Sequence, residues 1–328
     1  MSACVLAGDI GGTKTELAIY EVRGPRQLAR VGGQRFESRE HASFDEVVDS
    51  FLRRWGLRVE AAAFGVAGPV VNQRVEVTNL PWVLERGALA QRLATPKVEL
   101  LNDLGATAYG ALFLPETDLH LVNPGKQRSD SCAIIAAGTG LGQALLIWDG
   151  KRYRARPSEG GHADLAPRNR VEVELLRYLL SKFEHVSIER ALSGPGLKNI
   201  FDFVDEVLNV EVAPETRRRM QSQDAGAVIG ELGLNESCEA CSRALDLFID
   251  IYGAQAGNLA LTAMALGGVY VGGGPAVKLL PRLQQGGFMS AFTAKGRLED
   301  LMHEIPVRVI LNPQTCLLGA AQVAAEMT

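Results

Sequence analysis

Residues 4–20 read Cys4-Val-Leu-Ala-Gly-Asp-Ile-Gly-Gly-Thr-Lys-Thr-Glu-Leu-Ala-Ile-Tyr20, and residues 132–148 read Cys132-Ala-Ile-Ile-Ala-Ala-Gly-Thr-Gly-Leu-Gly-Gln-Ala-Leu-Leu-Ile-Trp148. Each segment runs from an apolar strand pattern through a glycine turn into a second apolar strand pattern. When Cys132 is laid over Cys4, Ile134 falls over Leu6 and Ile147 over Ile19. This similarity predicts a duplicated α/β module with a ligand cleft between the two copies.

The rest of the chain alternates strand and helix patterns, which is typical of an α/β protein. Strands are predicted at residues 5–7, 16–20, 61–66, 74–77, 98–101, 133–136, 143–148, 269–271 and 307–311. Helices are predicted at residues 43–55, 104–113, 172–183, 197–208, 237–265 and 314–326. Ser193 before Pro195 is a start signal for the fourth of these helices.

Composition narrows the class of protein. The 328 residues include 34 Lys and Arg against 38 Asp and Glu, a net charge of −4, and 47% are hydrophobic. Such a chain can bury a core in about two domains, which excludes general disorder. Because no long block of Lys and Arg occurs, nucleic acid is not the expected partner.

Cysteine usage and the chain's start favour the cytoplasm. Five cysteines are too few and odd in number for a secreted disulfide framework. Asp9 and Lys14 interrupt the first apolar run too early for a signal peptide. No charge occurs between Asp250 and Lys278, but the glycines and Pro275 there argue against a membrane span and favour a buried helix ending near Leu266.

The glycine turns are candidate phosphate sites. In the first turn, Gly11 and Gly12 allow backbone amides to converge on an anion, Thr13 adds a hydroxyl, and Asp9 is a candidate Mg²⁺ ligand, directly or through water. The alternative is an ordinary hairpin turn. The role of Lys14 stays open.

Two later turns strengthen the phosphate interpretation. Gly138, Thr139 and Gly140 stand at the equivalent place in the second module, so both turns could hold one polyphosphate. Gly273 and Gly274, after a third apolar strand, could admit a flat adenosine. P-loop and dinucleotide-binding spacings are absent from these turns.

At this point the sequence resembles the bacterial ATP-dependent glucokinases of the hexokinase-like superfamily. The matching segments, which run in order along the chain, are Gly8-Asp-Ile-Gly-Gly-Thr-Lys14, Gly65-Val-Ala-Gly-Pro69, Thr78-Asn79 with Trp82, Leu101-Asn-Asp103, Gly138-Thr-Gly-Leu-Gly142, Glu159-Gly-Gly-His162, residues 188–196, Gly272-Gly-Gly274 and residues 238–246. The resemblance implies two actin-like ATPase domains of the ribonuclease H-like type. We expect a smaller N-terminal α/β domain of residues 1–113 and 313–328, and a larger C-terminal α/β domain of residues 114–312.

The resemblance also implies the substrates, ATP with Mg²⁺ and glucose, and their sites. Asp103 would be the general base for the sugar 6-hydroxyl, which suits a carboxylate because a hydroxyl is a poor nucleophile at neutral pH. Other sugar ligands would be Asn79, Asn102, Glu159, His162 and Glu189. Without the resemblance, Asp103 would be interpreted as a helix cap, residues 159–162 as a solvated loop and Glu189 as a surface residue at a helix start.

The same motifs are compatible with other substrates and with other functions. The substrate could be mannose, fructose or an amino sugar. A sugar-responsive repressor would need a DNA-binding segment, and only seven residues precede Gly8. An actin-like or chaperone ATPase would not need the sugar residues.

Cys238 and Cys241 suggest zinc but lack two close partners, so buried structural thiols are favoured. Members of the family are commonly homodimers, which we therefore expect here.

Overall fold

The computed structural model describes residues 3–24, 27–56 and 58–328. The chain forms two compact units. Unit 1 comprises Met1–Asp118, Ala155–Pro157 and Asn312–Thr328, and unit 2 comprises Leu119–Arg154 and Ser158–Leu311. The functional domains predicted from the sequence, with boundaries after residues 113 and 312, stay a prediction.

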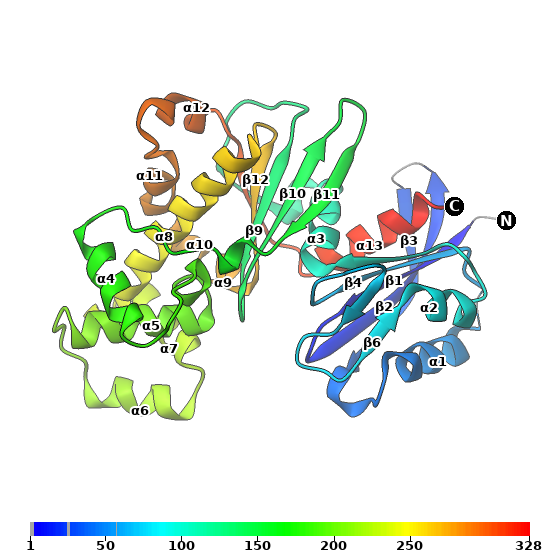
Figure 1. Ribbon diagram of the computed structural model, residues 1–328, viewed down its shortest axis with the longest axis horizontal. Helices are drawn as coiled ribbons and strands as arrows, with labels where there is room; N and C mark the ends of the chain where they lie inside the picture. Colours follow the sequence, from blue (N-terminus) through cyan, green and yellow to red (C-terminus); the bar gives the residue numbers. More distant parts are fainter. Residues whose placement is uncertain (1–2, 25–26, 57) are drawn as a thin grey trace. The chain divides into compact units, whose positions relative to one another are not determined.

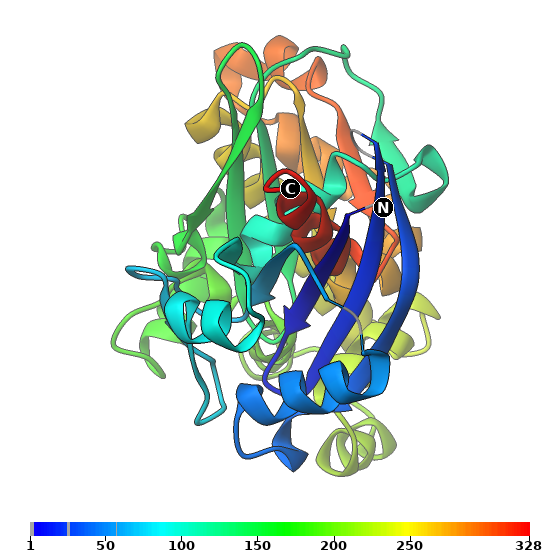
Figure 2. The same cartoon turned by 90° about the vertical axis from the view of Figure 1, so that its right-hand side faces the viewer.

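Unit 1 is built on a five-stranded sheet of order β3-β2-β1-β4-β7. Strands β1 (Cys4–Ile10), β2 (Lys14–Gly24) and β3 (Gln27–Glu37) form an antiparallel meander, seen in blue in Figure 2. Strands β4 (Ala61–Val66) and β7 (Val98–Asn102) extend the sheet in parallel with β1. A small separate sheet pairs β5 (Arg74–Glu76) with β6 (Val83–Glu85).

Alternation along β1 divides unit 1 into layers, because successive side chains point to opposite faces. Leu6 and Ile10 face a core shared with α1 (Phe44–Trp55), whereas Val5 and Ala7 face α13 (Thr315–Ala325). Figure 1 shows these two helices on opposite faces of the sheet. The remaining elements are η1 (Ser38–Glu40), α2 (Arg86–Arg92), α3 (Asp103–Ala111) and η2 (Glu116–Asp118).

Helix α3 packs closely on α13 because glycines remove side chains from the contact. A Cβ atom on Gly110 would lie 2.0 Å from the Thr315 carbonyl oxygen, and one on Gly319 would lie 1.8 Å from that of Ala106. Both distances are far below van der Waals contact. Helix α3 is therefore held closely against α13, with its last turn at Thr315 and Ala106 of its first turn at Gly319.

Unit 2 repeats the sheet of unit 1. Its order is β11-β10-β9-β12-β13-β8, with β9 (Cys132–Ala137) antiparallel to β10 (Leu141–Trp148) and parallel to β12 (Gly268–Gly272). The other strands of this sheet are β8 (Leu119–Asn123), β13 (Val307–Ile310) and β11 (Tyr153–Ser158), of which residues 155–157 are grouped with unit 1. Apart from the added β8, the order follows that of unit 1, and β9, β10, β12 and β13 pair in the same directions as β1, β2, β4 and β7, so the predicted duplication is confirmed.

The strand register differs between the two hairpins. Leu6 pairs with Ile19 in unit 1, but Ile134 pairs with Ala144 rather than with Ile147. The cause is a shorter second turn, which closes with Ala137 opposite Leu141. The ungapped overlay of the two sequences therefore matches the hairpins but not the facing residues.

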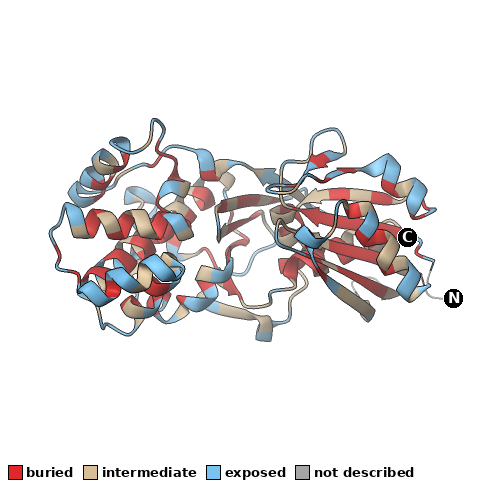
Figure 3. Cartoon of the chain, turned by 90° about the horizontal axis from the view of Figure 1, so that it is seen from below, coloured by how far each residue is buried: buried red, intermediate tan, exposed pale blue. Residues whose placement is uncertain are grey.

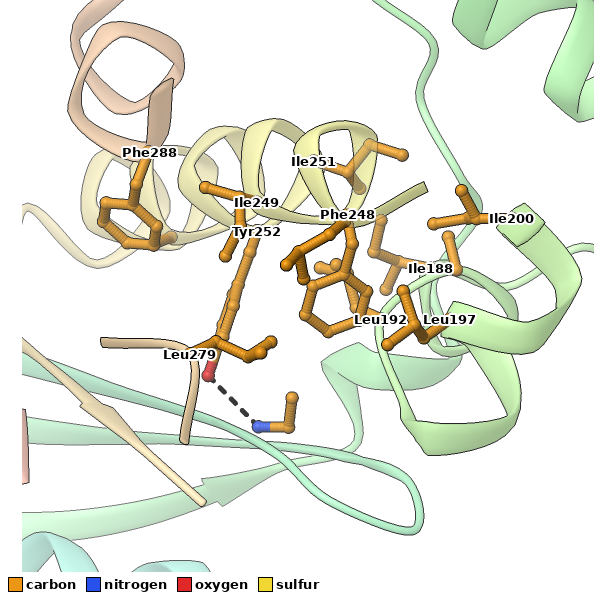
Figure 4. Packing of buried hydrophobic residues seen from close by; sticks show 14 of the residues in the cluster. Ile188, Leu192, Leu197, Ile200, Phe248, Ile249, Ile251, Tyr252, Leu279 and Phe288 are labelled. Carbon is orange, nitrogen blue, oxygen red and sulfur yellow. Dashed lines mark hydrogen bonds between the residues drawn. The ribbon is translucent and has the colours of Figure 1, made fainter. Parts of the chain in front are cut away.

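A helical layer covers the unit 2 sheet. Helix α8 (Glu239–Ala263) forms its centre, and Figure 4 shows Phe248 and Tyr252 of α8 among buried residues from neighbouring elements. Buried residues gather on the strands and on inward helix faces (Figure 3). The other elements are η3 (Gly160–His162), α4 (Arg170–Leu180), η4 (Ile188–Arg190), α5 (Gly194–Glu206), α6 (Pro214–Ser222), α7 (Ala225–Leu234), α9 (Gly274–Lys278), α10 (Leu280–Leu283), α11 (Gly287–Thr293), η5 (Gly296–Leu298) and α12 (Glu299–His303).

Helix α8 accounts for the long uncharged stretch of the sequence. It ends at Ala263, slightly before the predicted end near Leu266, and Met264 follows with a φ of 45° in the left-handed region. In the part of the chain that the structure describes, none of the helices has the length and apolar character that a membrane span requires.

Candidate active site

The first glycine turn joins β1 to β2 and is braced by Ser38. The Gly11 amide donates to the Lys14 carbonyl oxygen over 3.0 Å. The Ser38 hydroxyl donates to the Gly11 carbonyl oxygen over 2.8 Å, and its amide donates to that of Thr13 over 2.8 Å. The turn backbone is thus fixed from outside, while Thr13 and Lys14 stay exposed.

Asp9 lies on β1 just before this turn, beside the start of α13. Burial raises the pKa of Asp9, and a hydrogen bond from the Cys316 thiol partly offsets that rise. A Cβ atom on Gly65 would lie 2.5 Å from Cys316 Sγ and 3.7 Å from the Asp103 Cα. The thiol therefore lies close to both the Asp9 carboxylate and the first residue of α3.

Asn102 and Asp103 follow β7 and open helix α3. Asn102 is the N-cap: its Oδ1 accepts from the amides of Leu104, over 3.0 Å, and Gly105, over 3.3 Å. Its Nδ2 donates to the Gly68 carbonyl oxygen over 3.2 Å. The capping role thus falls to Asn102 rather than to Asp103.

Asp103 is the first helical residue of α3. Its Oδ1 accepts from the Leu104 amide over 2.8 Å, and its carbonyl oxygen accepts from the Thr107 hydroxyl over 2.8 Å. The first turn of a helix favours a negative charge, so this position suits an ionised carboxylate that later accepts a proton.

Asn79 lies against the first glycine turn. A Cβ atom on Gly12 would lie 2.7 Å from the Thr78 carbonyl oxygen and 3.5 Å from Asn79 Cβ. Asn79 is exposed and has a φ of 64°, in the left-handed region that asparagine tolerates better than most residues. Its side chain therefore belongs to the same face as the turn.

The second glycine turn, in unit 2, is tied to two neighbouring segments. The Gly138 amide donates to the Gly140 carbonyl oxygen over 2.8 Å, and the Gly194 amide donates to that of Gly138 over 2.8 Å. The Leu141 amide donates to Glu189 Oε2, also over 2.8 Å. Thr139, at the tip of the turn, is exposed.

In the segment predicted to be a loop, Glu159 precedes a single 3₁₀ turn, η3, and His162 is the last residue of that turn. Glu159 Oε2 lies 4.0 Å from His162 Nε2, and both side chains are about two-thirds exposed (66% and 64%). A Cβ atom on Gly161 would lie 2.0 Å from the Leu141 carbonyl oxygen. The turn therefore packs against the strand that leaves the second glycine turn.

Gly273 and Gly274 follow β12, and Gly274 lines a cavity of unit 2. Gly273 has a φ of 88°, and a Cβ atom there would lie 1.9 Å from the Ala137 carbonyl oxygen, so only glycine fits. The cavity holds about 320 Å³ and is mainly apolar. Its lining includes Ser193, Gly194, Gly226, Phe248, Gly274 and Pro275.

Each unit gathers its own set of the predicted residues. Unit 1 brings together Asp9, Gly11, Gly12, Thr13, Asn79, Asn102 and Asp103, and unit 2 brings together Gly138, Thr139, Gly140, Glu159, His162, Glu189, Gly273 and Gly274. Sequence reasoning missed three supporting residues, Ser38, Tyr252 and Cys316. No local motif marks them, because their function depends on which distant segment each one contacts.

The Asp9 surroundings fit a bound Mg²⁺ that is held mainly by phosphate and water. Magnesium prefers oxygen ligands and usually binds through one or two carboxylates plus substrate phosphates. A half-buried carboxylate such as Asp9 would gain from a nearby positive charge. Among the described residues, no group of three or more His, Cys, Asp and Glu forms a metal site by itself.

Comparisons with known proteins identify relatives over the full length. A sequence model of the glucokinase family matches residues 6–327. A glucokinase of Trichormus variabilis is 42% identical, covering 98% of this chain and 99% of its own, and one of Yersinia pestis is 35% identical, covering 98% and 96%. The solved glucokinase of an Antarctic psychrotroph is 28% identical with a TM-score of 0.89, covering 99% and 100%.

Fold and relatives together define the class. The duplicated sheets with their glycine turns are those of a two-domain sugar kinase of the actin-like ATPase fold. Within that class, the chain belongs to the glucokinase family. It is an ATP-dependent kinase that phosphorylates glucose.

Proposed function

We propose that Asp103 is the general base of this reaction, in which the γ-phosphoryl group of MgATP passes to the 6-hydroxyl of D-glucose. The observation that carries the proposal is the place of Asp103: it opens α3, and the Cys316 thiol lies close both to it and to Asp9. A carboxylate within hydrogen-bond reach orients the hydroxyl and accepts its proton as the phosphoryl group leaves ATP.

The phosphates are assigned to the glycine turns. Backbone amides of Gly11, Gly12 and Thr13 in unit 1, and of Gly138, Thr139 and Gly140 in unit 2, would bind phosphate oxygens. When bound beside Asp9, Mg²⁺ would neutralise phosphate charge. The adenosine would enter the apolar cavity lined by Gly274 and Pro275, which follow Gly273 in the chain.

The sugar is assigned to polar groups of both units. Glu159, His162 and Glu189 offer acceptors and an imidazole, which suit vicinal hydroxyls that both donate and accept. Asn102 has both Oδ1 lone pairs engaged, so it would contribute its remaining Nδ2 proton to a sugar oxygen. Asn79 would line the same site. Glucose is the ligand in the solved structure of a relative from Balamuthia mandrillaris, which is 25% identical with a TM-score of 0.80, covering 98% of this chain and 94% of its own.

We further propose that the protein acts in the cytoplasm as a homodimer. Five free cysteines are consistent with a reducing compartment. Sedimentation equilibrium of the purified protein measures the oligomeric state. A monomer at micromolar concentration would contradict the proposed homodimer.

The test of the function is a coupled assay of the purified protein with MgATP and a panel of hexoses. We expect the highest kcat/KM with glucose, and much lower values with mannose, fructose and glucosamine. A hexose that exceeds glucose would reassign the substrate. Turnover of ATP that no hexose stimulates would contradict the sugar kinase assignment.

A further inference from the structure

Glu189 occupies a junction between two cavities of unit 2. Its backbone lies in η4, and its carbonyl oxygen accepts from the Ser193 hydroxyl over 2.8 Å. Ser193 in turn caps α5 by accepting from the Gly196 amide over 2.9 Å. Ser193 therefore joins η4 to the start of α5 by hydrogen bonds.

The Glu189 side chain contacts the second glycine turn directly. Its Oε2 accepts from the Leu141 amide over 2.8 Å. A Cβ atom on Gly140 would lie 2.5 Å from the same oxygen. The carboxylate thus packs against the turn, and the glycine at position 140 is what leaves room for it.

Residues of this segment line two cavities. A polar cavity of about 420 Å³ has Glu189 and His162 in its lining, along with Ser187, Arg190 and residues 182–185. The apolar cavity of about 320 Å³ is lined by Ser193 and Gly194, and the Gly194 amide bonds to Gly138 of the turn. Glu189 therefore lines the proposed hexose cavity, its carboxylate bonds to the second glycine turn, and its carbonyl oxygen bonds to Ser193 of the apolar cavity.

We infer that Glu189 is a positioning residue that couples hexose occupancy to nucleotide binding within unit 2. The inference rests on the proposed function, which places Glu189 in the hexose site. An ionised carboxylate has about four acceptor sites, so it can keep the Leu141 amide and still accept from sugar hydroxyls. A bound hexose would hold the carboxylate in place and thereby fix the turn for phosphate, and linkage makes the effect reciprocal.

The experiment measures the dissociation constant of a non-hydrolysable ATP analogue with Mg²⁺, with and without saturating glucose. For the unchanged protein we expect glucose to tighten the analogue by about fivefold or more, the lower end of typical coupling. In Glu189→Ala, we expect weaker analogue binding without glucose and loss of most of the glucose effect.

Two further variants distinguish a positioning role of Glu189 from a general structural defect. Glu189→Gln keeps an oxygen that can accept from Leu141, so analogue binding should recover to nearly the original value while glucose binding stays weak. His162→Ala removes a proposed hexose contact without touching the turn, so glucose should weaken while analogue binding without glucose does not change. Circular dichroism and the unfolding midpoint verify that each variant is folded.

A reverse test starts from the turn. In Gly140→Ala, the new methyl group would displace the flexible Glu189 carboxylate, so glucose binding should weaken although Gly140 belongs to the phosphate turn. Gly138→Ala is the matched control, because a Cβ atom there meets nothing within 4 Å. In a Glu189→Ala background, Gly140→Ala should add no further loss of glucose affinity.

The outcomes are distinguishable from failure of the proposed function. Absence of glucose binding to the unchanged protein would contradict the proposed function, while the analogue affinity of Glu189→Ala without glucose still tests the positioning role. If Glu189→Ala binds the analogue normally and keeps the full glucose effect, the inference is wrong. Equal effects of Gly138→Ala and Gly140→Ala on glucose would also overturn it.

Discussion

At the residue scale, hydrogen-bond capacity separates Asn102 from Asp103. Both Oδ1 lone pairs of Asn102 serve the α3 amides, and one Nδ2 proton serves Gly68. Asn102 can therefore orient a ligand but cannot take up a proton. Asp103 is the neighbouring group with the chemistry of a base.

Asp103→Asn should fold and bind glucose yet lose most of its turnover, because the amide keeps the shape but cannot accept a proton. Removing a general base typically lowers the rate by about 10² to 10⁴. Steady-state kinetics measure kcat, and Asp300→Asn, also in the first turn of a helix, is the control. A kcat close to that of the unchanged enzyme would refute the assignment of the base.

Substitutions of the proposed sugar residues should change the KM for glucose, and substitutions of the proposed phosphate residues should change the KM for ATP. A carboxylate that loses its charge weakens a charge-assisted hydrogen bond, which contributes roughly 1.5 to 3 kcal/mol. Glu159→Gln should therefore raise the KM for glucose strongly and that for ATP little. Thr139→Val, which removes an exposed hydroxyl at the tip of the second turn, should do the opposite.

One result would contradict this assignment of residues to sugar and phosphate. If Glu159→Gln changed the KM for ATP while that for glucose stayed the same, Glu159 would belong with the nucleotide. The proposed division between sugar and phosphate groups would then be wrong.

At the element scale, the sequence predicted those strands and helices whose residues carry their own signal. The continuous apolar run of β4 was found with its bounds intact, and Ser193 caps α5 as expected. Strand β3 was missed because polar residues and Gly32 and Gly33 interrupt its apolar pattern, and because it is held by pairing with β2 rather than by burial. The short helices α9 to α12 were missed because a few residues are too short for a periodic pattern.

The same limit applied to the site. Motifs located the glycine turns and the carboxylates, since each needs particular residue types next to one another in the chain. Ser38, Tyr252 and Cys316 support those turns from distant segments, and only the folded chain brings them there.

Tyr252 forms hydrogen bonds to the residues that precede the second glycine turn, at Gly138, and the third, at Gly273. Its hydroxyl accepts from the Ala137 amide and donates to the Gly272 carbonyl oxygen, each over 3.2 Å, and Figure 4 draws the first of these bonds. Ala137 precedes the turn at Gly138, and Gly272 precedes Gly273. One buried hydroxyl thus joins the ends of β9 and β12.

Tyr252→Phe should lower stability and weaken ATP binding together. The change leaves the Ala137 amide and the Gly272 carbonyl without this partner, and an unsatisfied buried polar group costs about 1 to 3 kcal/mol. Denaturant unfolding and the KM for ATP measure the two effects. Tyr178→Phe is the control, because its hydroxyl bonds to the exposed Glu206. An unchanged KM for ATP in folded Tyr252→Phe would show that the turns do not depend on this hydroxyl.

At the scale of the whole molecule, the same sheet order occurs in both units, and this duplication was visible in the sequence because both hairpins kept their apolar and glycine pattern. The register of the second hairpin was not visible, because it depends on the length of the turn. A conserved order of strands with a changed register explains why the two units can present different groups beside similar turns.

Cys238 and Cys241 lie at the start of α8, where they contribute to the structure of the helix. Cys238 caps α8, with its Sγ accepting from the Cys241 amide over 3.4 Å, and Cys241 is fully buried. Burial raises the pKa of the Cys241 thiol, whereas zinc binding requires a thiolate. Within the described residues all five cysteines are free thiols.

We therefore expect that metal analysis of the purified protein finds no stoichiometric zinc and that turnover depends on added Mg²⁺. Cys238→Ser should retain activity, because a serine hydroxyl is a good N-cap and the free energy of unfolding should change by no more than about 1 kcal/mol. A chelator should abolish turnover, and Mg²⁺ should restore it because the metal acts with the phosphates rather than in the fold. About one zinc per chain, lost to the chelator together with activity that Mg²⁺ alone fails to restore, would contradict the structural role of the pair.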